Sequence, residues 1–553
     1  MRFGLHSGPV TAGVLRGEKA RFQLFGDTMN TTARIESTGA KNKIHLSQET
    51  ADLLISSGKS HWVRPREDKV VAKGKGELTT FWLELKGDRA LSSRSGSSES
   101  GSDFDDLNDQ ISQKRASKTP TGGLPDKYVR LVNWNKELML KVLKEQVARR
   151  TALNINPDSD EALSDLESKT LQHDHTVLDE VKDVVRLPEY RSEFTSPKGL
   201  TEKVRFSDNV VDQLFSFLHA VASMYRDNPF HNFEHASHVT MSVVKLLGRI
   251  VTPEEVIAGS DGEDEDTIAR NMHEHTYGIT SSPLTQFAVI FSALIHDVDH
   301  TGVPNSILVQ EQSSIAAVYK NKSVAEQNSV DIAWELLMQD CFKDLRRTIY
   351  TTADEFSRFR QMVVNMVMAT DIMDKELSAA RKARWNVAFS ESVLEDESPQ
   401  SETASELMNR RATIVIEHVM QASDVAHTMQ HWHIYRKWNQ RLFEEMYRAY
   451  QDGRSDKDPS LNWYEGEIGF FDFYIIPLAM KLRSCGVFGV SSDEYLNYAK
   501  QNRKEWEARG REVVEEMVAS VKSKQQFKED EVVKQPLPAM KTSLQSKKTP
   551  SAA

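Results

Sequence analysis

Apolar positions repeat with a helical period through most of the chain after residue 125. In the stretch "LVNWNKELMLKVLKEQVARR", Trp134, Leu138 and Val142 stand four residues apart, as they would on one face of a helix. Similar patterns recur along the rest of this region, over 204–250, 284–296, 306–340, 354–384, 407–450 and 467–483. Because strand-like alternation is rare between these stretches, this part of the chain is predicted to be all-α.

The first 86 residues follow a different pattern. Short alternating stretches, "MRFGLH", "KIHLS" and "TTFWLEL", predict strands, and "GDTMNTTARIEST" predicts a loop that enters a helix. Residues 1–86 are therefore predicted to form a separate mixed α/β domain. Residues 87–124 include the Ser-, Gly- and acid-rich stretch 91–110, which has almost nothing to bury and predicts a disordered linker.

Polar segments also interrupt and end the helical region. Acidic stretches at 259–266 and 390–405 predict solvated loops. The tail from about Gln525 is polar and contains Pro and Lys, which predicts disorder after the end of the last helix.

Composition limits the compartments and partners that suit this chain. A length of 553 residues exceeds one ordinary core, so two or more domains are expected. Two cysteines, Cys341 and Cys485, are too few for a disulfide framework or a thiolate zinc site, and they suit a reducing compartment. The net charge of −11 disfavours a nucleic-acid partner. The longest apolar run is short and broken by Asp472, and the N-terminus lacks a signal-peptide pattern, so we expect a cytoplasmic chain without a membrane segment.

Two short bursts of histidine and aspartate carry the candidate chemistry. "HNFEHASHV" contains His231 and His235, whose four-residue spacing predicts one face of a helix, about one turn apart. "HDVDHTG" follows an apolar stretch, so His296 and Asp297 are expected at the rigid end of a buried helix. Imidazole and carboxylate suit zinc-like metals, and Asp424, after "ATIVIEHVM", offers a fourth ligand.

These motifs resemble those of the class I cyclic-nucleotide phosphodiesterases. HNxxH and HDxDHxG stand in the expected order, and the resemblance covers roughly 165–515, which implies an all-α catalytic domain preceded by a helical lead-in at 125–164. It implies zinc at a first site, with four ligands: His235, His296, Asp297 and Asp424. It implies magnesium or manganese at a second site, bridged by Asp297 and otherwise held through waters on three side chains: His300, Glu326 and Thr370. His231 matches the proton donor.

The stretch "GEIGFFDFYIIPLA" resembles the family's purine-binding segment. Phe470 matches the aromatic that stacks on the base, Phe230 matches the aromatic before the proton donor, and His427 stands where the family has Asn or His. Glu467 replaces the usual glutamine. An ionised carboxylate only accepts hydrogen bonds, which favours guanine, whereas a protonated Glu467 would imitate glutamine and remove that preference. At 327–329, "QNS" departs from the more usual Asn-His-His.

Residues 3–47 resemble the C-terminal half of a class III nucleotide cyclase domain, nearest the guanylate type. Asn30 and Arg34 match the pair that stabilises the transition state, and Lys75 matches a lysine that contacts the triphosphate. The resemblance implies a partial α/β, ferredoxin-like fold, through which two chains could form a homodimer. The family's two metal-binding aspartates lie upstream of this stretch, so no cyclase activity is expected. A truncated form of a longer fusion, which could carry a membrane anchor, is favoured over a degenerate remnant that binds nucleotides or partner chains.

The sequence thus predicts an enzyme that hydrolyses cGMP or cAMP to the 5′-monophosphate with two divalent metals. Two alternatives stay open. One is a non-catalytic nucleotide-binding regulator, in which Glu467 has spoiled substrate fit. The other is one part of a longer bifunctional guanylate cyclase–phosphodiesterase. The HDxDH motif alone would also suit the broader HD-type phosphohydrolases, which share a metal-binding helical core.

Overall fold

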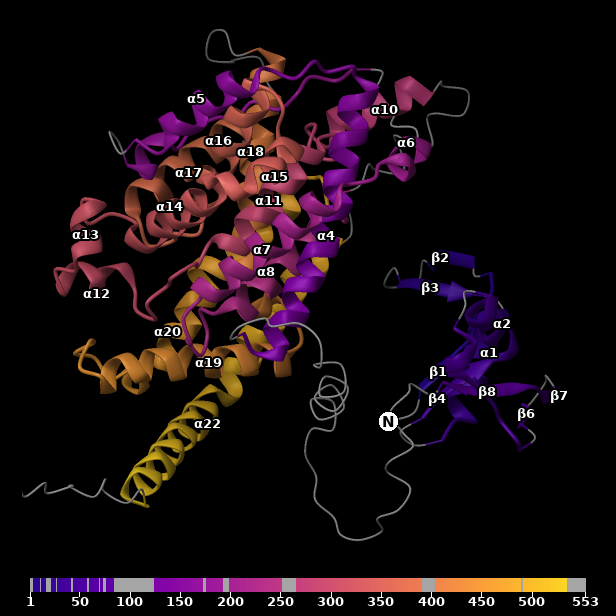
Figure 1. Ribbon diagram of the computed structural model, residues 1–553. Coiled ribbons are helices and arrows are strands. Elements are labelled where there is room, and N and C mark those ends of the chain that lie inside the picture. The colour runs from indigo at the N-terminus through magenta and orange to yellow at the C-terminus, as the bar shows by residue number, and fades with distance from the viewer. Residues whose placement is uncertain are drawn as a thin grey trace, which may run out of the picture. The chain divides into compact units, whose positions relative to one another are not determined.

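The computed structural model divides the chain into two units, 1–122 and 123–553, which are considered separately (Figure 1). It describes residues 3–9, 11–15, 21–25, 27–40, 43–56, 59–68, 70–72, 76–83, 124–172, 176–191, 198–250, 265–389, 403–488 and 491–534. The predicted linker up to residue 123 and most of both acidic stretches lie outside these ranges.

Unit 1 is a small α/β fold, as its alternating stretches predict. A four-stranded sheet has the order β1–β4–β8–β5, in which β1 is parallel to β4 and the other neighbours are antiparallel. Separate hairpins pair β2 with β3 and β6 with β7. The elements are β1 Phe3–Leu5, β2 Thr11–Leu15, β3 Arg21–Phe25, α1 Asp27–Ser37, β4 Ile44–Ser47, α2 Gln48–Ser56, β5 Val63–Pro65, β6 Val70–Ala72, β7 Gly76–Leu78 and β8 Thr80–Leu83.

The described core of unit 1 is thin. Its buried apolar cluster consists of Leu46, Ala51 and Val63. Helix α1 lies directly on strand β1. The contact is so close that a Cβ on Gly4 would stand only 2.2 Å from the backbone nitrogen of Glu36. The packing of α1 on the sheet therefore requires glycine at this position.

Unit 2 is helical, which confirms the all-α prediction. Its α-helices are α4 Asp126–Ala152, α5 Asp160–Thr170, α6 Lys198–Lys203, α7 Asp208–Met224, α8 Phe233–Leu247, α10 Glu265–His275, α11 Pro283–Ile295, α12 Asn305–Gln310, α13 Ser314–Val318, α14 Val324–Met338, α15 Lys343–Ile349, α16 Ala353–Met368, α17 Lys375–Phe389, α18 Ala404–Asp424, α19 Trp432–Gln451, α20 Trp463–Phe470, α21 Ile476–Ser484 and α22 Ser491–Lys534. A 3-10 turn, η7 Ala426–Met429, follows α18, and a π-helical turn, η9 Phe471–Ile475, joins α20 to α21.

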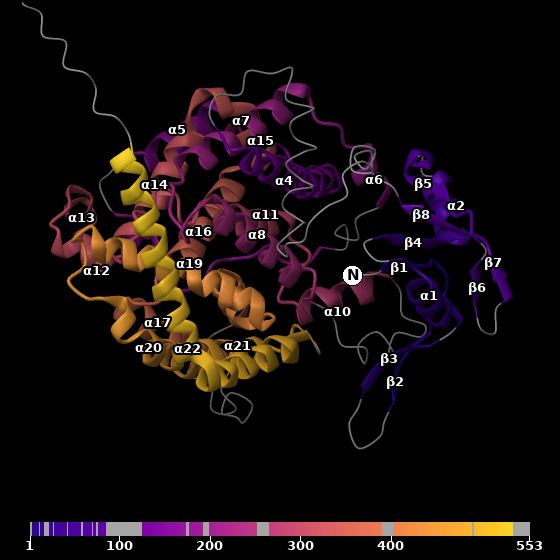
Figure 2. The same ribbon diagram turned by 90° about the horizontal axis from the view of Figure 1, so that it is seen from below.

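Helix α11 lies at the centre of unit 2 (Figures 1 and 2). Every residue from Phe287 to Ile295 is buried, and the helix packs against α4, α8 and α16. A helix that is apolar on all sides is expected where other helices surround it. Phe291 illustrates the packing, since its ring centroid lies 5.6 Å from that of Phe217 and 5.3 Å from that of Phe359.

Buried ion pairs attach the lead-in helices to the rest of unit 2. Arg150 of α4 lies 3.0 Å from the Glu355 carboxylate of α16, and Arg346 of α15 lies 3.1 Å from Glu167 of α5. All four side chains are less than a tenth exposed. Because an unpaired buried charge is costly, each pair fixes the position of the lead-in helix that contributes to it.

The last helix is longer than its composition predicts. Helix α22 continues past Gln525 to Lys534, where the polar sequence predicts disorder. Glu, Lys and Gln have good helix propensity, so a polar composition does not by itself end a helix. Among the helices in the described parts of the chain, none is both long and apolar enough to cross a bilayer.

We expect Phe291→Ala to destabilise unit 2 by about 3–5 kcal/mol, because it leaves a cavity in the central aromatic cluster. Phe473→Ala is the matched control, since Phe473 is 86% exposed and its loss should change stability by less than about 0.5 kcal/mol. Urea unfolding followed by circular dichroism measures both effects. Equal destabilisation by the two substitutions would contradict the central position of α11.

Candidate active site

Four predicted metal ligands come together from the ends of three helices. His235 lies in the first turn of α8, His296 caps the C-terminal end of α11 with Asp297 directly after it, and Asp424 is the last residue of α18. The three helices pack against one another, so their ends meet at one place. The prediction that His296 and Asp297 follow a buried helix is correct.

The distances from the two imidazole nitrogens to the carboxylate oxygens suit a tetrahedral metal. His235 Nε2 lies 3.0 Å from Asp424 Oδ1 and 3.7 Å from Asp297 Oδ2. His296 Nε2 lies 3.2 Å from Asp297 Oδ2 and 3.4 Å from Asp424 Oδ1. A tetrahedral centre with bonds of about 2.0–2.1 Å places its ligand atoms about 3.3–3.4 Å apart.

Two of these atoms lack hydrogen bonds despite being buried. His296 Nε2 and Asp297 Oδ2 have no hydrogen-bond partner, and leaving such atoms unsatisfied is costly. His296 Nδ1 lies 2.9 Å from the carbonyl oxygen of Ala293, to which it can donate. That hydrogen bond leaves Nε2 unprotonated in the neutral ring and available to a metal. The donor set and its spacing therefore fit a zinc-like cation.

His231 does not share a helical face with His235, so this part of the sequence prediction is wrong. Helix α8 begins at Phe233, and His231 lies in the preceding loop. Asn232 is the N-cap: its side-chain oxygen accepts hydrogen bonds from the backbone N–H groups of Glu234 and His235. Because the helix starts only after this cap, His231 lies outside it, and its ring can turn toward a different partner.

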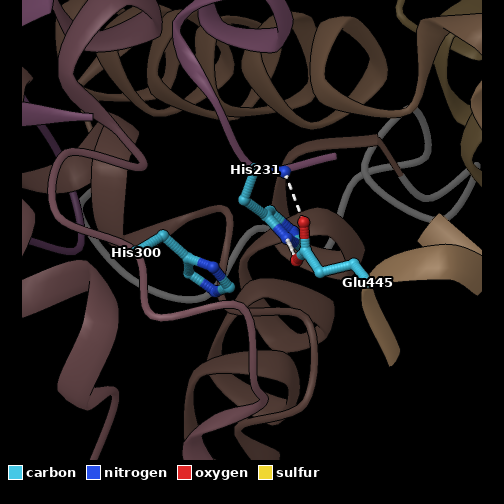
Figure 3. Close-up of side chains that lie close together, drawn as sticks. All are labelled: His231, His300 and Glu445. Carbon is cyan, nitrogen blue, oxygen red and sulfur yellow. Dashed lines mark hydrogen bonds and ion pairs between the residues drawn. The ribbon is translucent and has the colours of Figure 1, made fainter. Parts of the chain in front are cut away.

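That partner is Glu445 of α19, which the sequence did not indicate (Figure 3). His231 Nδ1 lies 2.5 Å from Glu445 Oε1, and the backbone N–H groups of Phe230 and His231 donate to Glu445 Oε2 at 2.8 and 3.0 Å. The Glu445 side chain is 3% exposed. With three donors already bound, this carboxylate has the environment of an anchor for His231 rather than of a metal ligand.

His231 and His300 lie side by side, but their environments shift their pKa values in opposite directions. Their ring centroids are 3.9 Å apart. Burial lowers the pKa of His231, but the carboxylates of Glu445 and Asp297 outweigh it and raise the pKa to about 9. Burial and the neighbouring charge of His231 lower the pKa of His300 to about 4. At neutral pH, His231 is therefore the cation and His300 is neutral.

One asparagine ties the loops of these two histidines together. Asn228 Nδ2 donates to the carbonyl oxygens of His231 and His300, at 3.1 and 2.7 Å. The backbone N–H of Gly302 donates to His300 Nδ1 at 3.2 Å. Because Nδ1 accepts this hydrogen bond, neutral His300 carries its proton on Nε2 and can donate from that atom.

The residues predicted to hold a second metal through waters form an acidic neighbourhood. Burial and the charge of Asp371 raise the pKa of Glu326 to about 8. The side-chain amide of Asn305 donates to Glu326 at 2.8 Å and lies 3.4 Å from Asp371 Oδ2, so it links the two carboxylates. Thr370 directly precedes Asp371, and its hydroxyl donates to the carbonyl oxygen of Val367. Asp371 and Asn305 carry no signal in their immediate sequence and were missed.

The unusual "QNS" sequence supports the loop after α11. Asn328 Nδ2 donates to Asp299 Oδ2 at 3.4 Å, and the Ser329 hydroxyl donates to the carbonyl oxygen of Val298 at 2.9 Å. Asp299 has a left-handed φ of 62° and is also bound by Arg226 at 2.7 Å. These contacts stabilise the turn between Asp297 and His300.

The purine-binding segment places Glu467 in a defined hydrogen-bond network. The Tyr435 hydroxyl lies 2.6 Å from Glu467 Oε2. Trp463 Nε1 donates to Asn439 Oδ1 at 3.1 Å, which turns the Asn439 amide N–H group toward Glu467. Burial raises the pKa of Glu467 to about 7, although the hydrogen bonds from Tyr435 and Asn439 oppose it.

Comparison with protein families agrees with this geometry. Residues 230–486 match the family described as 3′5′-cyclic nucleotide phosphodiesterase. The chain carries a 3′,5′-cyclic nucleotide phosphodiesterase domain. Residues 1–85 match the family described as adenylate and guanylate cyclase catalytic domain, in agreement with the second resemblance.

Curated relatives of the phosphodiesterase domain are distant. The dual specificity calcium/calmodulin-dependent 3′,5′-cyclic nucleotide phosphodiesterase 1C of Mus musculus is 26% identical over 286 residues, which cover 48% of this chain and 33% of the mouse protein. The probable 3′,5′-cyclic phosphodiesterase pde-1 of Caenorhabditis elegans is 27% identical over 259 residues, or 45% of this chain and 32% of that protein. The chain thus spans about a third of the length of these relatives.

Solved structures include the phosphodiesterase domain of the RhoPDE fusion protein from the choanoflagellate Salpingoeca rosetta. It is 20% identical, with a TM-score of 0.42, and the match covers 65% of this chain and 93% of that chain.

The other predicted residues of the phosphodiesterase domain lie in mixed environments. Phe230 is 5% exposed and packs against His235 and His427, with ring centroids 4.6 and 5.5 Å apart. Burial and the charge of His235 lower the pKa of His427 to about 3, so this ring is neutral. Phe470 is partly buried, and its ring stacks on Tyr474 across the π-helical turn. Contact of these residues with a substrate stays a prediction.

The predicted cyclase residues lie apart from the phosphodiesterase domain in sequence. Asn30 and Arg34 are both exposed and stand four residues apart on α1. Lys75 lies outside the described residues.

Glu445 is the main residue that the sequence prediction missed in the phosphodiesterase domain. Its position continues the buried stripe of α19 formed by Tyr435, Trp438 and Leu442. A carboxylate on an apolar stripe is unusual, and buried Glu is rare unless it is paired. The acidic residue on this apolar stripe was the one sequence feature that indicated a buried, paired carboxylate, but it does not identify His231 as the partner.

We expect Glu445→Gln to lower the pKa of His231 from about 9, because it removes the largest charge that opposes the effect of burial. An NMR pH titration of the histidine rings in the metal-free protein measures the midpoint. Glu444→Gln is the matched control, since Glu444 is paired with Lys524 instead. An unchanged His231 midpoint in Glu445→Gln would show that Glu445 is not its anchor.

Proposed function

We propose that this chain hydrolyses 3′,5′-cyclic nucleotides to 5′-nucleoside monophosphates, with zinc at a first metal site and magnesium or manganese at a second. The observation that supports this best is the convergence of two imidazoles and two carboxylates, with imidazole–carboxylate distances of 3.0–3.7 Å, in the same site as a cationic imidazole. The family match of residues 230–486 supports the same reaction.

His231 has the properties of the general acid. Its Nδ1–H is directed at Glu445, so Nε2 carries the proton that can be transferred. As the P–O3′ bond breaks, Nε2–H donates its proton to the departing O3′. A pKa of about 9 keeps the ring protonated at neutral pH, and general acids of this kind contribute about 10²–10⁴-fold to the rate.

The remaining residues would hold the cations and orient the phosphate. His235, His296, Asp297 and Asp424 would bind the first cation, and Asp297 would also contact the second. His300, Glu326 and Thr370 would act on the second through waters. Bound divalent cations in such centres lower the pKa of water and offset phosphate charge. Neutral His300 would offer its Nε2–H as a hydrogen-bond donor in the same region.

We expect the whole chain to hydrolyse cGMP and cAMP in the presence of Mg²⁺ or Mn²⁺ and trace Zn²⁺. Asp297→Ala should reduce turnover to background, because it removes the ligand proposed to be shared by both cations. Asp354→Ala is the matched control, since its carboxylate is 80% exposed on α16. Release of 5′-monophosphate, followed by chromatography, measures the activity. A folded, metal-loaded wild type without turnover would favour the nucleotide-binding regulator instead.

The purine preference should depend on the charge of Glu467. Tyr435 and Asn439 each direct a donor at this carboxylate, and its remaining lone pairs can accept from a base. Ionised Glu467 offers only acceptors, which suits the N1–H and N2 amine of guanine. Protonated Glu467 offers a donor as well and could bind either purine. With a pKa of about 7, both forms are present near neutral pH.

We expect the ratio of kcat/KM for cGMP to that for cAMP to rise as pH increases through about 7, where Glu467 ionises. The ratio removes effects that are common to both substrates, including the titration of His231. An unmatched buried acceptor costs about 1–3 kcal/mol, so the ratio should change by about 5–150-fold. Glu467→Gln should make the ratio independent of pH, whereas the exposed Glu465→Gln on the same helix should not. A wild-type ratio that stays constant would exclude Glu467 as the selector.

For unit 1 we propose pairing with a second copy. Phe3 and Leu5, on the sheet-edge strand β1, are 41% and 46% exposed, which supports an apolar contact there. Sedimentation equilibrium of the whole chain should give a dimer that Leu5→Asn weakens, and a monomeric wild type would refute it. The companion proposal is that the chain is cytoplasmic, which fractionation of cell extracts would test.

A further inference from the structure

Unit 2 contains a cavity of about 220 Å³ that is separate from the predicted ligand and substrate residues. Helices α16, α17 and α18 and the segment 181–183 enclose it. This volume would hold about seven water molecules at about 30 Å³ each, so it suits a ligand of a few heavy atoms. Its walls are largely apolar and include Val181, Met368, Leu377 and Ala380.

One of the two arginines in the cavity is paired with protein carboxylates. Arg384 is 7% exposed, and its Nη2 donates to Glu417 Oε2 at 2.7 Å. Its Nη1 donates to the carbonyl oxygen of Asp183 at 3.0 Å, and its Nε lies 3.5 Å from the Asp183 carboxylate. The amide of Asn365 donates to the other oxygen of Glu417. The acidic groups of the cavity are therefore paired without Arg381.

Arg381, three residues before Arg384 on α17, is the arginine of the cavity that makes no ion pair with a described residue. Its Nη2 donates to the backbone carbonyl oxygen of Asp371 at 2.9 Å. Among the described residues it makes no ion pair and no further hydrogen bond, although a guanidinium has five N–H donors. Burial lowers its pKa, although the charge of Glu417 opposes this shift.

We propose that this cavity binds a small monocarboxylate, whose carboxylate pairs with Arg381 and whose apolar body packs against Met368 and Leu377. A planar carboxylate can accept two parallel N–H bonds from a guanidinium, which supplies the missing counterion. A multiply charged, strongly hydrated anion such as phosphate suits these apolar walls less well.

The cavity is connected to the proposed hydrolytic site through Asp371. The Asp371 carbonyl oxygen accepts from Arg381, while its side chain lies within reach of Asn305, which also binds Glu326. A ligand that repositions the guanidinium therefore acts on the acidic neighbourhood proposed to hold the second cation. This connection, unlike the binding itself, rests on the proposed function.

Titration of the full chain with butanoate, followed by calorimetry, tests the binding site. We expect saturable binding by wild type and at least about tenfold weaker binding by Arg381→Gln, a change of about 1.4 kcal/mol. Ala380→Trp, at an exposed position on the cavity wall, should also abolish binding without removing a charge. Lys382→Gln is the matched control, because Lys382 is exposed and does not line the cavity.

The outcomes separate the alternatives. No saturable binding at millimolar butanoate, or equal binding by folded Arg381→Gln, would overturn the site. Inorganic phosphate that binds as well as butanoate would overturn the assignment to a carboxylate. The second arm measures the Mn²⁺ concentration for half-maximal cyclic-nucleotide hydrolysis with and without butanoate. A shift of at least about twofold in wild type, absent in Arg381→Gln, supports the connection, and binding without a shift overturns it.

Discussion

The packing of three buried helices against one another is the constraint on which the site depends. The start of α8 and the ends of α11 and α18 meet at the place where His235, His296 with Asp297, and Asp424 gather. Because α11 is buried along most of its length, it cannot shift without opening the core. The fold itself therefore holds the ligand atoms in place. The same packing also excludes water from around them.

The sequence predicted what depends on local pattern and composition. The all-α unit, the α/β unit, and the buried helix before His296 all follow from periodicity. The loop position of His231 did not, because the spacing of His231 and His235 looks the same whether or not a capping asparagine separates them. Glu445 could not be paired with His231, since the two are 214 positions apart in the chain and no local pattern records that contact.

Identical side chains acquire different roles here through their surroundings alone. His231 and His300 stack closely, yet one faces the buried carboxylate of Glu445 and the other faces the cation that this carboxylate stabilises. A similar balance acts on Glu467. Burial raises its pKa and two hydrogen-bond donors lower it, so the pKa lies near neutral pH. In each case the residue type sets the chemistry that is possible, and the neighbours select which form is present.

The separation of the four ligands along the chain links metal binding to the folding of unit 2. His235 and Asp424 are 189 residues apart, so no short peptide of this sequence can offer the complete set. A cation that binds the native arrangement and not the unfolded chain would stabilise the unit by about 2.7 kcal/mol at a hundredfold excess over its dissociation constant. Among the described residues of unit 1 no such ligand set occurs, so loading the metal should raise the thermal stability of unit 2 relative to that of unit 1.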